Sequence, residues 1–164
     1  LGRISDPDVR QNLIALLEDE SNQVRFNAAT SLAEMSQPEG ITFLFSALED
    51  HDPILRANAV KFLAEVQKSS AAVESELLEA LGHDNSLARS GAAQVLGEAH
   101  VEMALQELLE ATKDEIAHVR WNAIIALGTI RSPASRARLQ ELLEDDNDTV
   151  AYYAEWALLQ LGPG

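Results

Sequence analysis

An arginine recurs along this chain at nearly constant spacing, and this period restricts the possible folds more than any other feature. The pattern Val/Leu/Ala-Arg-x-x-Ala occurs at intervals of 31, 33 and 31 residues, with its arginine at Arg25, Arg56, Arg89 and Arg120. A fifth copy follows 31 residues later with Ala151 in the arginine position. Such a period is typical of a solenoid, in which each repeat buries its apolar face only against its neighbours.

Each repeat contains two amphipathic segments. Residues 38–50 and 53–66, for example, both carry apolar side chains at three- and four-residue spacing, which predicts a pair of helices. Prolines preceded by Asp6, Asp52 and Ser132 indicate helix starts, because the preceding side chain can cap the helix. The first helices of the pairs are expected to start near Pro7, Pro38, Ser70, Val101 and Pro133. The second helices are expected to start near Asn22, Pro53, Ser86, Ala117 and Thr149.

The segments predict a single all-α array over residues 1–164. Residues 1–4 are expected to end a preceding helix, and the repeats to cover about residues 5–36, 37–67, 68–99, 100–131 and 132–162. The two additional residues of the second repeat fit a longer loop at residues 67–71. Because neither end has the polar surface of a capping repeat, we expect a fragment of a longer array, or ends that dock onto something or self-associate.

Composition narrows the class of partner. With 46% hydrophobic residues the chain can bury a continuous core, and its 27 acidic against 12 basic residues give a formal charge of −15. This charge would repel nucleic acids and anionic lipid surfaces and attract basic proteins or peptides. The chain has no cysteine and no apolar run of the roughly 18 residues that span a bilayer. We therefore expect a soluble protein and favour the cytoplasm.

The recurring arginine lies within the apolar stripe of its helix, because Ala28, Ala29 and Leu32 fall within about 60° of Arg25 at 100° per residue. A charge in this position needs partners. Six residues before each arginine position stand Asp19, Asp50, His83, Asp114 and Asp145. We predict a structural ladder in which these aspartates bind the guanidinium groups, within a repeat and across to the next, interrupted at His83 and Ala151.

The repeats resemble HEAT repeats, above all the HEAT-like type of phycobiliprotein lyase subunits. The residues that carry the resemblance are Pro38, Asp50 and Leu55-Arg56 in one repeat and Asp114, Val119-Arg120 and Leu127-Gly128 in another. The resemblance implies a right-handed α-solenoid of about five HEAT-like helix pairs, an α-α superhelix whose second helices line the concave side. It does not select a function, because these repeats serve transport, scaffolding, lyase and chaperone roles.

Four positions of each second helix, at one, two, five and nine residues after the arginine position, would form one outward strip. Its candidate partner-binding residues are Phe26, Asn27, Glu34, Asn58, Glu65, Glu98, Trp121, Asn122, Ile125, Tyr152, Tyr153 and Trp156. The asparagines either grip an extended peptide or bond to neighbouring turns. The aromatic residues form a contact site or pack against a further repeat. The glutamates are a solvated face or bind lysine and arginine.

Catalytic signatures are missing from the sequence. Deoxyhypusine hydroxylase, a HEAT-like enzyme, holds two irons with His-Glu pairs early in its second helices, where this chain has pairs such as Phe26-Asn27 and Trp121-Asn122. The four histidines share no spacing, and no phosphate loop or nucleophile elbow is present. We therefore predict no metal, no cofactor and no enzymatic activity.

The leading hypothesis is a protein–protein interaction scaffold that binds a basic or amphipathic segment on its concave face. One alternative is a subunit of a phycobilin-lyase-like enzyme or a chaperone, which would hold a tetrapyrrole or its acceptor protein against the same aromatic residues. Another is an architectural spacer or self-assembling array. The expected partner is a protein or peptide, without nucleic acid or membrane.

Overall fold

The computed structural model describes residues 7–68 and 70–163. Within these ranges the chain is an all-α solenoid of ten α-helices and three short 3-10 helices, without a strand. Its contacts divide it into two compact units, residues 1–63 (unit 1) and residues 64–164 (unit 2). None of the described helices is long and apolar enough to cross a membrane.

Unit 1 contains α1 (Pro7–Leu16), α2 (Asn22–Glu34), α3 (Pro38–Ala47) and the first part of α4 (Pro53–Gln67). Helix α2 packs against both α1 and α3. Ala29 and Leu32 in its apolar stripe are fully buried, and so is Leu44 of α3, the helix against which α2 packs. Burial of these side chains against neighbouring helices is the main source of helix stability here, since the helices are short.

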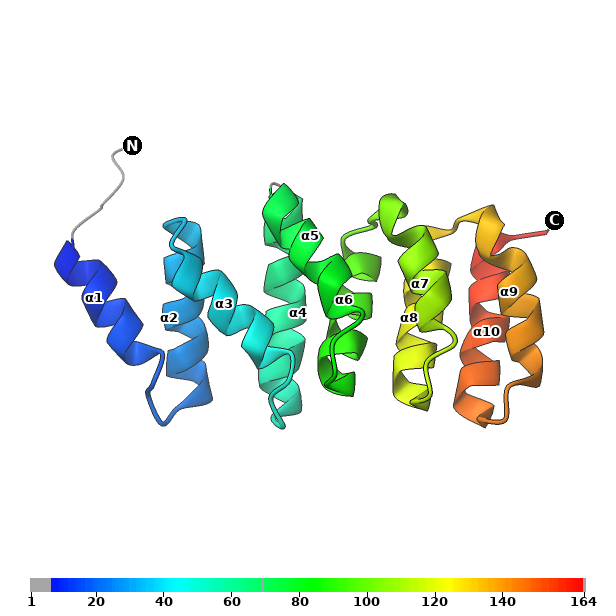
Figure 1. The fold of residues 1–164 in the computed structure, drawn as a ribbon, viewed down its shortest axis with the longest axis horizontal. Coiled ribbons are helices and arrows are strands. Elements are labelled where there is room, and N and C mark those ends of the chain that lie inside the picture. The colour runs from blue at the N-terminus through cyan, green and yellow to red at the C-terminus, as the bar shows by residue number, and fades with distance from the viewer. Residues whose placement is uncertain (1–6, 69, 164) are drawn as a thin grey trace. The chain divides into compact units, whose positions relative to one another are not determined.

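Unit 2 contains the end of α4, followed by α5 (Ala71–Ala80), α6 (Ser86–Glu98), α7 (Leu105–Ala111), α8 (Ala117–Ile130), α9 (Arg136–Glu141) and α10 (Asp148–Leu161). The 3-10 helix η1 (Glu102–Ala104) precedes α7, and η2 (Pro133–Ser135) and η3 (Leu142–Glu144) flank α9. Figure 1 shows two layers in this unit, with α5, α7 and α9 in front of α6, α8 and α10. Helix α8 packs against both α6 and α10.

The described helices begin within one residue of the predicted starts, counting η1 and η2 as starts of their first helices. Asp52 caps α4 as expected, because its Oδ1 accepts the Ile54 N–H at 2.8 Å. The predicted cap at Ser132 is wrong: its side chain makes no capping bond, and its carbonyl accepts the Ser135 N–H and hydroxyl at 3.1 and 2.7 Å. That carbonyl closes a 3-10 turn in place of a capped α-helical one. Asp6 and the helix end expected at residues 1–4 lie outside the described residues.

Two glycines set how closely the second helices of unit 2 approach one another. A Cβ atom on Gly97 of α6 would lie 2.7 Å from the Cα and 2.8 Å from the Cβ of Ala126 in α8. A Cβ atom on Gly128 of α8 would lie 2.9 Å from the Cβ of Ala157 and 2.7 Å from Cζ3 of Trp156 in α10. The helices therefore pack nearly backbone to backbone at these points, which only glycine allows.

Candidate partner-binding surface

Two arginine clamps join consecutive repeats of unit 2. The guanidinium of Arg89 binds the carboxylate of Asp114 in the next repeat through two hydrogen bonds, Nε to Oδ2 at 2.7 Å and Nη2 to Oδ1 at 3.0 Å. Arg120 binds Asp145 in the same way, at 3.0 and 2.7 Å. All four side chains are largely buried, so paired bonds to a planar carboxylate fix the register of the turns.

Within a repeat, the expected carboxylate–guanidinium contact is wrong in its acceptor atom. Nη1 of Arg89 donates to the backbone carbonyl of His83 at 2.8 Å, and Nη1 of Arg120 donates to that of Asp114 at 3.0 Å. The Asp114 carboxylate instead accepts the N–H of Ile116, two residues on, at 2.8 Å. His83 does the same with its ring, since Nδ1 accepts the Asn85 N–H at 3.2 Å, so the turn is kept without an aspartate.

In unit 1 the arginines make the same carbonyl contacts. Nη1 of Arg25 donates to the Asp19 carbonyl at 2.8 Å, and Nη1 of Arg56 donates to the Asp50 carbonyl at 2.6 Å. No ion pair joins Arg25 to Asp50 among the contacts of the described residues. Arg25 donates instead to Asn22 Oδ1, whose amide donates to Asp52, so an asparagine relays the contact to the next turn.

The clamps change the acidity of their carboxylates. Burial raises the pKa of Asp114, but hydrogen bonds from Arg89 and from the Ile116 N–H outweigh it and hold the pKa below its ordinary value. The pKa of Asp145 is lowered in the same way, with burial opposed by bonds from Arg120 and the Asn147 N–H. Both carboxylates are therefore ionised at neutral pH and unavailable as proton donors.

The aromatic cluster, defined as Trp121, Ile125, Tyr152, Tyr153 and Trp156, lies on α8 and α10 and is less free than expected. Only Tyr152 is exposed, at 63%, and the others are half-buried. Tyr152 and Tyr153 pack edge to face with centroids 5.3 Å apart, and Trp121 packs against His118 at 6.2 Å. Since Gly128 admits the ring edge of Trp156, this tryptophan serves partly to join α8 and α10.

The predicted asparagine row does not present uniform ligand donors. Asn122 is only 8% exposed, and its Nδ2 donates to Ser90 Oγ at 2.7 Å and to the His118 carbonyl at 2.8 Å. One amide hydrogen thus bonds within α8 and the other bonds to α6. These contacts favour the interpretation that the asparagine bonds to neighbouring elements over the interpretation that it grips a peptide. In unit 1, Asn27 is exposed and accepts the Gln23 amide at 2.9 Å, whereas Asn58 is half-buried.

The remaining strip residues of unit 1 are Phe26 and Glu34. Phe26 packs edge to face with Phe62 at a centroid distance of 6.4 Å and is half-buried. Glu34 is exposed at the end of α2. Phe26 therefore contributes to packing between α2 and α4, and Glu34 is open to solvent.

The second helices of unit 2 combine aromatic side chains with acidic charge and offer no available cation. Helices α6, α8 and α10 contain two arginines, both held in clamps, and no lysine. Glu98 of the strip is exposed, and Glu65 at the end of α4 is exposed and pairs with Lys68 at 2.9 Å. Asp148 and Glu155 are also exposed, on other sides of α10. The face thus favours a cationic ligand over an anionic one.

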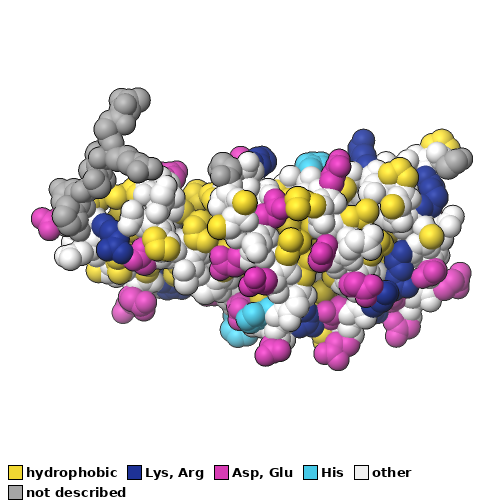
Figure 2. Space-filling view, turned by 45° about the horizontal axis from the view of Figure 1, so that its top comes forward, with side chains coloured by type: hydrophobic (Ala, Val, Ile, Leu, Met, Phe, Trp, Pro, Cys, Tyr) yellow, Lys and Arg dark blue, Asp and Glu magenta, His cyan; other side chains and the backbone are white. Residues whose placement is uncertain are grey.

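The turns between the helices of unit 2 add a second acidic feature. Asp84, Glu115 and Asp146 recur at 31-residue intervals, one per turn, and all three are exposed. Acidic side chains also outnumber basic ones over the face seen in Figure 2. Asp146 pairs with Arg120, whose Nη2 donates to its Oδ1 at 3.1 Å, so the repulsion between like charges on adjacent turns is partly offset. A basic partner would relieve the rest on binding.

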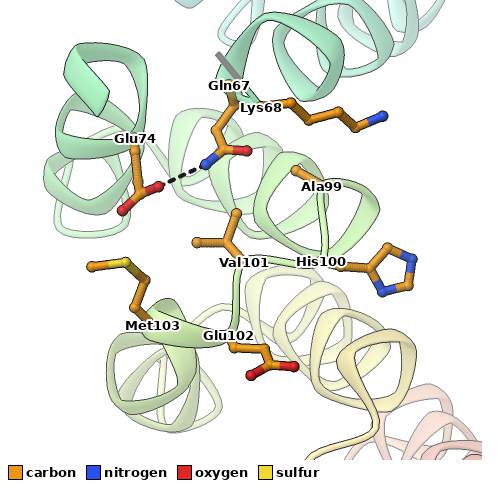
Figure 3. Close-up of a pocket in the computed structure, with 8 residues that line it drawn as sticks. All are labelled: Gln67, Lys68, Glu74, Ala99, His100, Val101, Glu102 and Met103. Carbon is orange, nitrogen blue, oxygen red and sulfur yellow. Dashed lines mark hydrogen bonds between the residues drawn. The ribbon is translucent and has the colours of Figure 1, made fainter. Parts of the chain in front are cut away.

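An open groove in unit 2 was not predicted from the sequence. It has a volume of about 650 Å³ and is lined by Gln67, Lys68, Glu74, Ala99, His100, Val101, Glu102 and Met103. Figure 3 shows the Gln67 amide reaching the Glu74 carboxylate, a hydrogen bond of 2.7 Å. The only signal for it in the sequence is the two-residue insertion at residues 67–71, which separates α4 from α5.

No three His, Cys, Asp or Glu side chains among the described residues are grouped closely enough to hold a metal ion. The positions that correspond to iron-binding His-Glu pairs contain Ser90-Gly91 on α6 and Trp121-Asn122 on α8. Neither pair offers the imidazole and carboxylate ligands of a di-iron site.

The repeat architecture and the arginine clamps define a helical repeat protein, and comparison with known families identifies the class. The model of HEAT repeats matches residues 1–64 and 74–159, so the chain belongs to the HEAT repeat family. A comparison with curated proteins found no match.

Several solved structures share this fold. The complex of CpcE and CpcF of phycocyanin lyase from Nostoc sp. PCC7120 is similar at 22% identity with a TM-score of 0.61, over 93% of this chain and 65% of that chain. Human deoxyhypusine hydroxylase in complex with glycerol is similar at 25% identity with a TM-score of 0.58, over 96% and 64%. A designed armadillo repeat protein is similar at 21% identity with a TM-score of 0.50, over 92% and 81%. The chain thus spans slightly less than two thirds of the first two proteins.

Proposed function

We propose that this chain is a non-enzymatic protein-interaction module whose unit 2 binds a basic, amphipathic segment of another protein across α6, α8 and α10. The observation that carries the proposal is the combination on these helices of half-buried aromatic rings, exposed carboxylates and no available cation. The family supports a binding role in general, and the site supports the charge of the ligand.

The energetics favour a ligand that is both cationic and apolar. A lysine or arginine over the face of Trp121 or Tyr153 would contribute about 0.5–2 kcal/mol, depending on how far the pair is desolvated. Apolar side chains packed on the same rings would add about 25 cal/mol per Å² buried. The formal charge of −15 would accelerate the encounter with a cation and make the association sensitive to salt.

The experiment compares two labelled model peptides of equal length, one with leucine and lysine and one with leucine and glutamate. The basic peptide is expected to bind, with an affinity that falls as salt rises, and the acidic peptide is not. Trp121→Ala should weaken binding of the basic peptide about tenfold, the loss expected for a central aromatic contact. Glu98→Lys, at an exposed position, should weaken it without affecting the fold.

The matched control is Met103→Ala, because Met103 is 71% exposed and lies on η1, outside α6, α8 and α10. This variant should bind the basic peptide as the wild type does. Equal binding of both peptides, or unchanged affinity in Trp121→Ala and Glu98→Lys, would remove the proposed site. Binding of a linear tetrapyrrole with a shifted absorbance spectrum would instead support a lyase-like role.

A further inference from the structure

Two positions of the first helices show how neighbouring repeats match their charges. In unit 1 the fourth residue of α1, Arg10, forms an ion pair with the second residue of α3, Glu39. In unit 2 the same two positions, counted from the starts of η1 and η2, hold Leu105 and Ala134. These positions therefore carry either opposite charges or two apolar side chains, and neither combination leaves a charge without a partner.

Glu74 of α5 and Met103 of η1 occupy these two positions and depart from this pattern. A carboxylate stands where unit 1 has Arg10, and a thioether stands where it has Glu39. Glu74 is half-buried, and its Oε2 accepts the side-chain N–H of Gln67, which is only 9% exposed and so holds the carboxylate in place. The Oε1 atom of Glu74 has no partner among the described residues.

Glu74 and Met103 both line the open groove of about 650 Å³ at the ends of α4 and α5. In Figure 3 the side chains of Met103 and Val101 extend to the side of the groove where Glu74 lies. Met103 is 71% exposed, whereas Val101 is buried. An apolar wall that ends at a carboxylate oxygen fits a ligand with an apolar stem and a hydrogen-bond donor at its tip.

The charges around the groove favour a cationic donor. Its lining contains two carboxylates, Glu74 and Glu102, and one lysine, Lys68. Lys68 pairs with Glu65 at 2.9 Å, and Figure 3 shows its ammonium group directed away from Glu74. A cation from outside the chain would therefore supply the charge that Arg10 supplies in unit 1.

The hydrogen bond from Gln67 selects an ammonium group over a guanidinium group. Arg89 and Arg120 each bind both oxygens of one aspartate. Glu74 cannot offer such a pair, because one of its oxygens is already bonded to Gln67. The single remaining oxygen suits an ammonium group, which acts as a point charge and needs no second oxygen in its plane.

We propose that this groove binds a primary ammonium group on an unbranched alkyl stem. The stem packs on Met103 and Val101, and the ammonium group donates to Oε1 of Glu74. A lysine side chain of a partner protein and a free alkyl diamine share this chemistry. The site lies apart from Trp121 and the other residues of the aromatic cluster, so it goes beyond the proposed function.

The test titrates n-butylammonium into protein that carries ¹³C-labelled methionine methyl groups. The chain has two methionines, so the Met103 signal reports on the groove and the Met35 signal, from unit 1, is the internal reference. Met103→Leu assigns the two signals. Butylammonium should shift the Met103 signal in a saturable manner with a roughly millimolar Kd, as expected for so small a ligand. Butanol and butyrate, with a similar stem, should bind at least about tenfold more weakly.

Glu74→Gln should weaken butylammonium binding about tenfold and preserve the fold, because an amide oxygen can still accept the Gln67 N–H. Glu76→Gln is the matched control, since it removes the same charge from an exposed position of α5 outside the groove. It should leave binding unchanged. An unmoved Met103 signal, equal shifts with butanol, or a preference for the ammonium group that survives Glu74→Gln would overturn the proposal.

Two further probes distinguish the sources of the ammonium group. Binding of Nα-acetyl-lysine methylamide at least as tight as that of butylammonium would indicate a lysine of a partner protein. Tighter binding of the diamine putrescine, with the gain removed by Glu102→Gln, would indicate a free diamine. Trp121→Ala should leave butylammonium binding unchanged, and Glu74→Gln should leave the leucine–lysine peptide unaffected, so failure of this proposal and failure of the proposed function are distinguishable.

Discussion

Replacing Gly97 by alanine tests the close packing of the second helices. The new Cβ would lie 2.7 Å from the Cα of Ala126, a backbone atom that cannot rotate away. Since carbon atoms pack best at about 3.5–4.0 Å, α6 and α8 must separate by roughly 1 Å. Overpacking costs about 1–3 kcal/mol, and because this contact is with a backbone atom we place the cost at about 2–3 kcal/mol, against a gain of about 1 kcal/mol from the higher helix propensity of alanine. We expect a net loss of about 1–2 kcal/mol.

The assay is urea and thermal unfolding followed by circular dichroism. For a unit of about 100 residues, 1 kcal/mol corresponds to about 4–8 °C in Tm, so Gly97→Ala should lower Tm by at least about 4 °C. Gly82→Ala is the matched control, because its Cβ would meet only the Glu79 carbonyl at an ordinary 3.6 Å. This control should be neutral or slightly stabilising. A Gly97→Ala protein as stable as the wild type would refute the packing described for α6 and α8.

Three further predictions concern hydrogen bonds and charges of unit 2. Asn122→Ala should cost about 1–3 kcal/mol in urea unfolding, because it leaves buried bonds to Ser90 and His118 unmade, whereas the exposed Asn27→Ala should cost less than about 0.5 kcal/mol. Arg120→Lys should be destabilising despite its retained charge, since an ammonium cannot make the paired bonds to Asp145; equal stability would show that only charge matters there. Because the folded pKa values of Asp114 and Asp145 lie below the ordinary value of about 3.9, their stabilisation is complete above that pH and lost as pH falls through the folded pKa. An Asp114→Asn, Asp145→Asn protein should therefore be less stable at pH 7 and lose less stability on acidification, and a parallel pH profile would contradict the clamp.

The architecture could be predicted because it depends on short-range signals that repeat. The spacing of apolar residues within one repeat recurs in the next repeat at the period of the arginine. The predicted helix starts therefore agree with the observed ones within one residue. The spacing of Asp114 and Arg120 also placed the turn beside the guanidinium. The spacing alone could not predict whether the guanidinium binds the carboxylate or the backbone carbonyl of Asp114, because both belong to the residue six positions before the arginine.

The environment of the strip residues was harder to predict because it depends on how neighbouring helices approach. Angles around one helix place Trp156 and Asn122 on an outward arc. The ring of Trp156 is partly buried because Gly128 lets it approach α8. The side chain of Asn122 is buried where it bonds to Ser90 on α6.

The central claim is that unit 2 binds a basic, amphipathic segment across its second helices, and the two tryptophans of the chain test it directly. In a ¹H–¹⁵N NMR spectrum each indole N–H gives one signal, and a Trp121→Phe protein assigns them. The account predicts that the leucine–lysine peptide shifts the Trp121 signal in a saturable manner that salt reverses, while the leucine–glutamate peptide leaves it in place. A titration in which the basic peptide binds but neither indole signal moves would contradict it.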